Sequence, residues 1–326
     1  MKKLLFLLGI LASFTASAQM EHPDKVGKAR RLEILFLGDN GHHKPIERVP
    51  SIMAALGDKG VNFTYTDKLA DINLGNLNKY DALMIYANWD SIPPSLEKDL
   101  LAYVASGKGV LPIHCASYCF RNSSEYVKMV GGQFWRHTLD TIETQTVKPE
   151  HVIMQGLKPF KAYDETYLHT KLQSDNNILA VRDIKADQFK DKPNTKTEPY
   201  TWTRSYGKGR VFYTAYGHDE NTWQNEGFHA LILRGILWAV NDEARQAHAA
   251  LKPEPFKYRE AKLPNYEKRP GIQYRQDPLS PEESMKHIQV PVEFNLALFA
   301  AEPNVMHPIA LSWDERGRMY VLITKD

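Results

Sequence analysis

The sequence predicts a three-layer α/β/α domain, in which a mostly parallel sheet lies between two layers of helices. Short apolar runs alternate with amphipathic segments at the spacing of strand–helix–strand units. The first unit comprises a strand-like run at 32–37, a helical segment at 50–56, and residues 61–65, which alternate like a half-buried strand. This order favours a flavodoxin-like arrangement with helices on both faces of the sheet.

The following segments continue the alternation. An apolar run at 81–86 precedes a helix at 93–104, whose leading prolines and following Gly107 mark its start and end. A strand then runs from Gly109 towards His114. The remaining expected elements are strands at 177–181 and 209–214 and a buried helix at 228–240, which is apolar nearly all round.

The first eighteen residues have the pattern of a cleaved signal peptide. Lys2 and Lys3 precede an apolar run at 4–11, and Ala16 and Ala18 give small residues at the −3 and −1 positions of a cleavage site. We therefore expect a mature chain that starts near Gln19 and is periplasmic or secreted. We expect no membrane span, because no later segment reaches about 18 uninterrupted apolar residues.

Composition excludes some partners and leaves others. The 41 basic and 39 acidic residues give no charge excess that would attract nucleic acid. Small neutral or weakly charged ligands are therefore expected. The two cysteines, Cys115 and Cys119, are four residues apart, a spacing that on a helix is unsuited to an unstrained disulfide.

The character of the chain changes after Asn241. Residues 242–285 contain six prolines among many charges and are predicted to be a linker. Residues 286–326 are strand-rich, and the expected strands lie at 294–299, 309–313 and 319–323. Because so short a unit cannot bury a core alone, we interpret it as the truncated start of a larger β domain.

Four polar clusters follow strand-like runs and carry the candidate chemistry. In open α/β sheets, ligands bind outside the carboxyl ends of the strands. We therefore expect His43, His114, Glu165 and His218 to converge at one edge of the sheet. Each also has a purely structural interpretation: the histidines could hydrogen-bond neighbouring loops, and Glu165 could cap a helix or form an ion pair.

Two kinds of chemistry suit these four residues. Histidine and carboxylate side chains bind divalent metals such as zinc and leave a position open for water or a sugar oxygen. Without a metal, His114, Glu165 and His218 could act as general acids and bases. The sequence leaves both alternatives open.

Residues 30–241 resemble the ThuA-like (trehalose-utilisation) family. The motifs that carry the resemblance are, in order, Gly41-His42-His43 with Pro45; Gly109 to His114 with Ser117 and Phe120; Gly131-Gly132 with Phe134 and His137; Asp164-Glu165 with Tyr167; and Gly207 to His218 with Trp238. The resemblance implies the fold of class I glutamine amidotransferase-like proteins and a role in carbohydrate metabolism. Residues 289–326 similarly resemble the first blade of a propeller found in secreted sugar-dehydrogenase-like proteins.

Cys115 lies near the position where amidotransferases keep a nucleophilic cysteine. That nucleophile sits on a sharp turn flanked by glycines, whereas Cys115 is flanked by His114 and Ala116. We therefore expect a buried apolar role for Cys115 and no glutamine amidotransferase activity.

Two functions follow from these residues. The first is an exported enzyme, a sugar hydrolase or isomerase, that acts on a disaccharide or its keto form; His43, His137, Asp164 and Tyr167 would contact the substrate. The second is a non-catalytic sugar-binding module tethered to a dehydrogenase-like propeller. The first is favoured, because a binding module has little use for Glu165 beside metal-competent histidines.

Overall fold

The computed structural model describes residues 28–188, 190–193, 195–261 and 274–323. The expected signal peptide at 1–18 lies outside the described residues, as does part of the expected linker. Within the described ranges, no helix has the length and apolar character needed to cross a membrane.

An eight-stranded sheet forms the middle layer, in the order β2-β1-β3-β4-β12-β11-β10-β7. Its strands are β1 (Leu32–Leu37), β2 (Val61–Thr66), β3 (Ala82–Ile85), β4 (Gly109–Pro112), β7 (Gln145–Thr146), β10 (Asn177–Asp183), β11 (Thr197–Tyr206) and β12 (Gly209–Thr214). The pairs from β2 to β12 are parallel, and those from β12 to β7 are antiparallel. The parallel part has the flavodoxin-like order, which confirms the predicted fold class.

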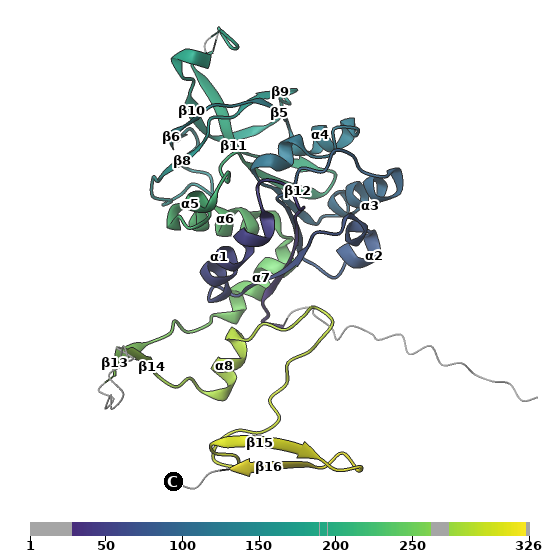
Figure 1. Cartoon of the computed structure of the whole chain (residues 1–326), viewed down its shortest axis with the longest axis vertical. Coiled ribbons are helices and arrows are strands. Elements are labelled where there is room, and N and C mark those ends of the chain that lie inside the picture. Colours follow the sequence, from purple (N-terminus) through teal and green to yellow (C-terminus); the bar gives the residue numbers. More distant parts are fainter. Residues whose placement is uncertain (1–27, 189, 194, 262–273, 324–326) are drawn as a thin grey trace, which may run out of the picture.

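Helices cover both faces of this sheet (Figure 1). On one face lie α1 (Pro45–Gly57), α5 (Glu220–Trp223) and α6 (Glu226–Ala239), and on the other lie α2 (Leu74–Leu77), α3 (Pro94–Ala105) and α4 (Ser124–Val130). Three short 3-10 helices are η1 (Leu69–Ile72), η2 (His114–Tyr118) and η3 (Ala186–Gln188). As predicted, α3 begins at the proline pair and ends just before Gly107, whose φ is +117°.

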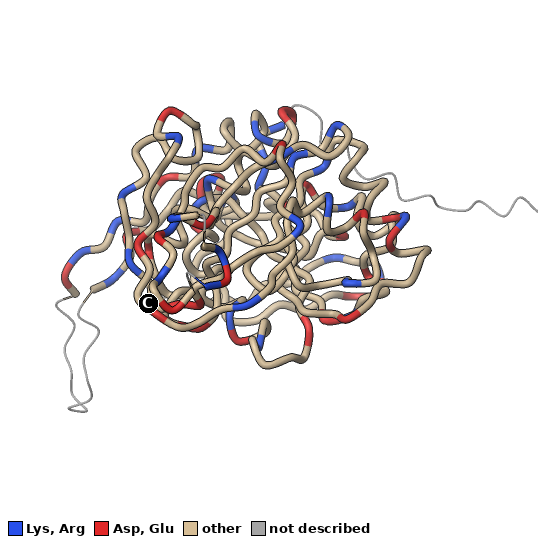
Figure 2. Tube along the Cα trace, turned by 90° about the horizontal axis from the view of Figure 1, so that it is seen from above, with Lys and Arg blue, Asp and Glu red and all other residues tan. Residues whose placement is uncertain are grey.

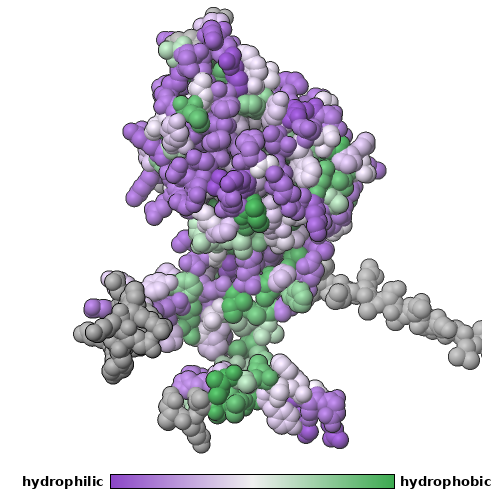
Figure 3. All heavy atoms as spheres, in the orientation of Figure 1, coloured by the Kyte–Doolittle hydropathy of each residue, from purple (hydrophilic) through white to green (hydrophobic). Residues whose placement is uncertain are grey.

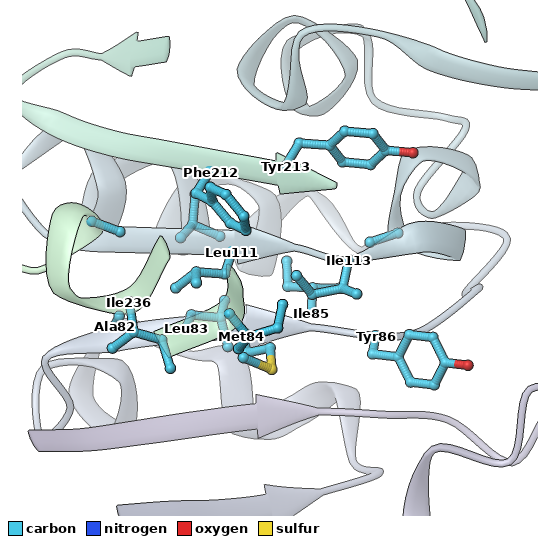
Figure 4. Packing of buried hydrophobic residues seen from close by; sticks show 14 of the residues in the cluster. Ala82, Leu83, Met84, Ile85, Tyr86, Leu111, Ile113, Phe212, Tyr213 and Ile236 are labelled. Carbon is cyan, nitrogen blue, oxygen red and sulfur yellow. The ribbon is translucent and has the colours of Figure 1, made fainter. Parts of the chain in front are cut away.

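The core lies between the parallel strands and the helices packed on them (Figure 4). All four residues of β3 are fully buried, which explains why this strand appears as a continuous apolar run in the sequence. Gly235 lets α6 approach β12 closely, since a Cβ there would lie 2.7 Å from Phe212. This packing fixes the end of β12, where one of the candidate site residues follows.

Two small sheets near the carboxyl edge were not predicted from the sequence. They pair β5 (Gln133–Arg136) with β9 (Leu168–Thr170), and β6 (Leu139–Glu143) with β8 (Lys161–Glu165). These strands are short and only partly buried; β6 has one buried residue, Ile142. They have functional importance because β8 ends at Glu165.

The structure differs from the expected linker in its first ten residues, which form α7 (Asp242–Leu251). Asn241 caps this helix by accepting a hydrogen bond from Ala244 N, and its buried residues are Ala244, Ala247 and Leu251. This helical spacing was obscured by the prolines that follow it. Beyond it lie β13 (Tyr258–Glu260), β14 (Tyr274–Gln276) and α8 (Pro281–His287).

The C-terminal unit contains two of its three expected strands. The hairpin of β15 (Pro308–Trp313) and β16 (Met319–Ile323) forms where predicted. The expectation of a strand at 294–299 was wrong: these residues have no strand partner in the described part of the chain and are exposed, Phe299 by 80 %. Several apolar side chains of this unit reach the surface, seen as green areas in the lower part of Figure 3. A propeller blade is not established by this hairpin.

Basic and acidic residues are interspersed along the trace (Figure 2). This distribution agrees with the near balance of 41 basic and 39 acidic residues in the sequence.

Candidate metal centre

The structure brings His43, His114, Glu165 and His218 together. One ligand atom from each residue lies within 4.8 Å of every other. The centroids of the His43 and His114 rings are 5.2 Å apart, and those of His43 and His218 are 5.6 Å apart. Three of the residues follow the parallel strands β1, β4 and β12, whose carboxyl ends meet at one edge of the sheet. Glu165 reaches the same point from β8.

His43 lies in the loop between β1 and α1. Asp39 holds this loop by accepting hydrogen bonds from Gly41 N at 2.8 Å and Asn88 N at 2.5 Å. The imidazole is 5 % exposed, and its Nε2 has no hydrogen-bond partner. Burial, together with neighbouring His114, lowers the pKa of His43 to about 2. The ring is therefore neutral and offers a lone pair, the form in which histidine binds a metal.

His114 occupies the sharp turn from β4 into η2. Its φ of +48° is in the left-handed region, which costs a non-glycine residue about 1–2 kcal/mol. The residue in this strand-to-helix elbow is thus His114, whereas Cys115 comes one position later in the chain. Its Nδ1 lies 2.6 Å from the carbonyl oxygen of Ala215. Because a carbonyl only accepts, Nδ1 carries the proton, and Nε2 faces the site with a lone pair in the neutral ring.

Glu165 is surrounded by imidazole nitrogens. Its carboxylate oxygens lie 3.2 Å from His114 Nε2, 3.1 Å from His218 Nδ1 and 3.3 Å from His137 Nε2. Burial on its own raises the pKa of Glu165, but His114 and His218 outweigh burial and hold that pKa well below its usual value. Glu165 is therefore an anion at neutral pH.

His218 contributes the third inward-facing imidazole of the cluster. Its Nδ1 is buried and lacks a hydrogen bond of good geometry, although it lies 3.1 Å from Glu165. The contact with Glu165 raises the pKa of His218. A proton or a metal cation between this nitrogen and the carboxylate would satisfy both groups, so the geometry suits either acid/base or metal chemistry.

The other expected substrate contacts divide into two groups. Asp164 is fully buried, and its carboxylate accepts hydrogen bonds from the backbone N–H groups of Glu165, Gly217 and His218 and from the Thr222 hydroxyl. Tyr167 is 2 % exposed and lies against His114, with ring centroids 4.3 Å apart. Asp164 therefore holds the backbone of the cluster, whereas the Tyr167 hydroxyl lies 3.0 Å from His114 Nε2, the nitrogen that faces the site. His137, by contrast, is 38 % exposed and lies on its outer side.

A second layer of side chains was missed by sequence reasoning. The Tyr213 hydroxyl contacts Ser117 Oγ at 3.0 Å and the His114 carbonyl oxygen at 3.3 Å. The same hydroxyl lies 3.0 Å from His169 Nε2, and His169 Nδ1 lies 3.1 Å from Glu198. These buried contacts, from Glu198 through His169 to Tyr213, help to hold the turn at His114 in place. No local pattern in the sequence identifies His169 or Glu198.

Cys115 and Cys119 are free and buried. Burial raises the pKa of the Cys115 thiol well above its usual value, so no reactive thiolate forms near neutral pH. This supports the interpretation of Cys115 as a packing residue.

Comparison with known proteins identifies the family. Residues 33–239 match the ThuA family, described as trehalose utilisation. The chain belongs to the ThuA family. A ThuA-like protein from Bacteroides uniformis is 18 % identical, with a TM-score of 0.56 over 68 % of this chain and 97 % of the other. A ThuA-like protein from Parabacteroides merdae is 20 % identical, with a TM-score of 0.53 over 64 % of this chain and 90 % of the other.

Two further comparisons concern the C-terminal residues and the curated proteins. Residues 280–326 match a domain of unknown function, DUF7133. No curated protein matches the chain. The structural neighbours therefore support the fold of this ThuA-family protein, and the family description indicates a sugar-related role without naming a reaction.

Proposed function

We propose that this ThuA-family protein is a metal-dependent enzyme that acts on a sugar, either a disaccharide or a keto-sugar. His43, His114, His218 and Glu165 would hold the divalent metal. The observation that carries the proposal is that two buried ring nitrogens that make no hydrogen bond of good geometry, His43 Nε2 and His218 Nδ1, lie in one cluster with an ionised carboxylate.

The residues present fit such a metal. Three imidazoles and one carboxylate form a donor set that suits first-row divalent ions and does not single out zinc. The unpartnered nitrogens explain why a cation would be favourable, since buried polar atoms are otherwise hydrogen-bonded. A metal held there supplies Lewis-acid polarisation of a sugar oxygen or activation of water.

The chain's own residues would orient the substrate and move protons. The His114 ring is fixed by its hydrogen bond to Ala215, so its Nε2 cannot turn away from the site. His137 lies on the outer side of Glu165 and is 38 % exposed, so it can reach a bound sugar and exchange a proton with it. Glu165, 3.3 Å from His137 Nε2, would orient that ring towards the substrate.

The metal is tested by elemental analysis of the purified protein and of variants. We expect a stoichiometric divalent metal in the parent, with lower occupancy in His114→Ala and Glu165→Gln. His151→Ala and Glu143→Gln are matched controls, because neither residue belongs to the cluster. A chelator should remove the metal together with turnover of disaccharides or their keto forms.

Other outcomes would replace parts of this proposal. If no metal is found while Glu165→Gln still abolishes turnover, acid/base chemistry by His114, Glu165 and His218 replaces the metal. If sugar binds without turnover, the protein is a binding module. If neither substitution changes metal content, sugar binding or turnover, the cluster is structural.

We also propose that the protein is exported and that residues 286–326 begin a propeller domain with dehydrogenase-like partners. The signal-peptide pattern at 1–18 supports export. The β15–β16 hairpin and the match of residues 280–326 to a separate domain support a second unit. Cell fractionation tests the first proposal, and the structure of a chain extended beyond residue 326 tests the second.

A further inference from the structure

Arg48 is a buried cation without a partner among the residues that the structure describes. It lies in the first turn of α1, five residues after His43, and is 7 % exposed. Its Nε is buried and has no hydrogen-bond partner, and no described residue forms a hydrogen bond or ion pair with its guanidinium. Buried arginines are almost always paired, because an unpaired buried charge is costly. Arg48 therefore requires an explanation that the fold alone does not give.

The surroundings of Arg48 place it beside the candidate metal centre. Arg48 lies in the first turn of α1, which begins two residues after His43, and its charge lowers the pKa of Tyr86, which burial raises well above its usual value. The Tyr86 ring is 5.8 Å from the His43 ring and 6.5 Å from the His114 ring. The Tyr86 hydroxyl donates to Gly217 O at 2.6 Å, next to His218. Arg48 is thus near a phenol that contacts three of the four cluster segments.

The start of α1 adds positive potential at the same place. Its N-cap, Lys44, has a φ of +50° and makes no side-chain capping bond. The first N–H groups of a helix, with the helix dipole, favour an anion. The exposed Glu47 pairs with Lys44 at 3.3 Å. The buried carboxylate nearest along the chain, Asp39, already accepts from Gly41 N and Asn88 N.

We propose that Arg48 binds an anionic oxygen group of the substrate, a carboxylate or a phosphate carried by a sugar. The guanidinium fork matches the two oxygens of such a group. The substrate of this protein is then an acidic or phosphorylated sugar, one end of which lies at the His/Glu cluster while its charged group pairs with Arg48. This inference rests on the proposed function for the position of the sugar, and the charge preference can be measured separately.

The test is calorimetric titration of the metal-loaded full chain with glucuronate, glucose 6-phosphate and glucose. We expect one charged sugar to bind at least tenfold more tightly than glucose. Arg48→Met should abolish that preference and leave the metal content unchanged. Arg275→Met is the matched control, because Arg275 is exposed on β14, and it should bind like the parent.

The two charged sugars distinguish the sources of the anion. Preference for glucuronate identifies a carboxylate, and preference for glucose 6-phosphate identifies a phosphate. Equal affinity for all three sugars, binding of none of them, or an unchanged preference in Arg48→Met overturns the proposal.

The stability of Arg48→Met shows whether Arg48 recognises the substrate or holds the fold together. Because Arg48 has no partner to lose, Arg48→Met should unfold no more easily than the parent in the absence of sugar. If that variant does not fold, Arg48→Lys decides: weaker binding of the charged sugar supports the proposal, and unchanged binding overturns it. A parent protein that binds no stoichiometric metal and turns over no sugar, yet still prefers the charged sugar through Arg48, would refute the proposed function while leaving the role of Arg48 standing.

Discussion

Asp164→Asn should weaken both the fold and the metal site, because Asp164 holds two parts of the cluster. One carboxylate oxygen accepts from the N–H groups of Glu165 at 2.7 Å and His218 at 3.2 Å. The other accepts from Gly217 N and the Thr222 hydroxyl, each at 2.8 Å. Asparagine keeps the shape and replaces one of these oxygens by an NH2 group.

The loss of folding stability is worked out for the orientation of the asparagine amide that leaves the fewest hydrogen bonds broken. With the NH2 group towards Thr222, the hydroxyl can rotate and accept, but the N–H of Gly217 faces another donor. One charge-assisted hydrogen bond is lost and a buried N–H is left unpaired, which together cost about 3 kcal/mol. For a domain of this size that corresponds to a fall of roughly 6–12 °C in Tm. Metal affinity should fall about 10- to 100-fold, as for other residues that orient ligands.

The assay is thermal unfolding followed by circular dichroism, with metal affinity measured by competition against a chelating dye. Asp175→Asn is the control, since Asp175 is 71 % exposed and its ion pair with Arg204 is worth about 1 kcal/mol or less. If Asp164→Asn melts within about 2 °C of the parent and binds metal equally well, the carboxylate does not organise the site as we infer.

Three further predictions concern other parts of the chain. Cys115→Ala should leave turnover within a few-fold of the parent, because the buried thiol is not ionised; complete loss of turnover in a folded variant would contradict this. Burial on its own raises the pKa of Glu198, but His169 and Lys192 hold it below its usual value of 4.5, so Glu198 stabilises the fold above that pH and loses this effect as pH falls below it. Urea unfolding should therefore show Glu198→Gln to be less stable than the parent at pH 7, with a difference that shrinks below pH 4.5; a difference independent of pH would refute the electrostatic explanation. Limited proteolysis should cut first between 252 and 285 and leave the domain that ends with α7, whereas first cleavage inside 100–230 would count against an independent domain.

The central sheet could be predicted because its parallel strands are buried on both faces. Such strands appear in the sequence as short apolar runs, and β1 and β12 have the predicted bounds. The small strands β6 and β8 lack this signal because few of their buried positions are apolar: Ile142 in β6 and Ala162 in β8. Similarly, α7 was missed because its narrow apolar face lies next to a proline-rich segment.

The site was predictable to the extent that it follows the strand-end rule. His43, His114 and His218 follow parallel strands of one sheet, so their convergence is a consequence of topology. The same rule pointed to Glu165, but β8, the strand that ends at Glu165, lies outside that sheet, so the topology of the main sheet does not by itself explain its position. Arg48 was missed because its sequence context is that of an ordinary surface arginine, and its burial becomes visible only in the folded chain.

The position of β12 between β4 and β11 sets the order in which the candidate metal centre can be assembled. The first histidine of the cluster is at residue 43 and the last at residue 218, directly after β12. Half of the chain can therefore be synthesised, and several strands paired, before the ligand set exists. The proposed metal would then bind only at the end of folding, and it would be chosen from the ions available in the compartment where the last central strand enters the sheet.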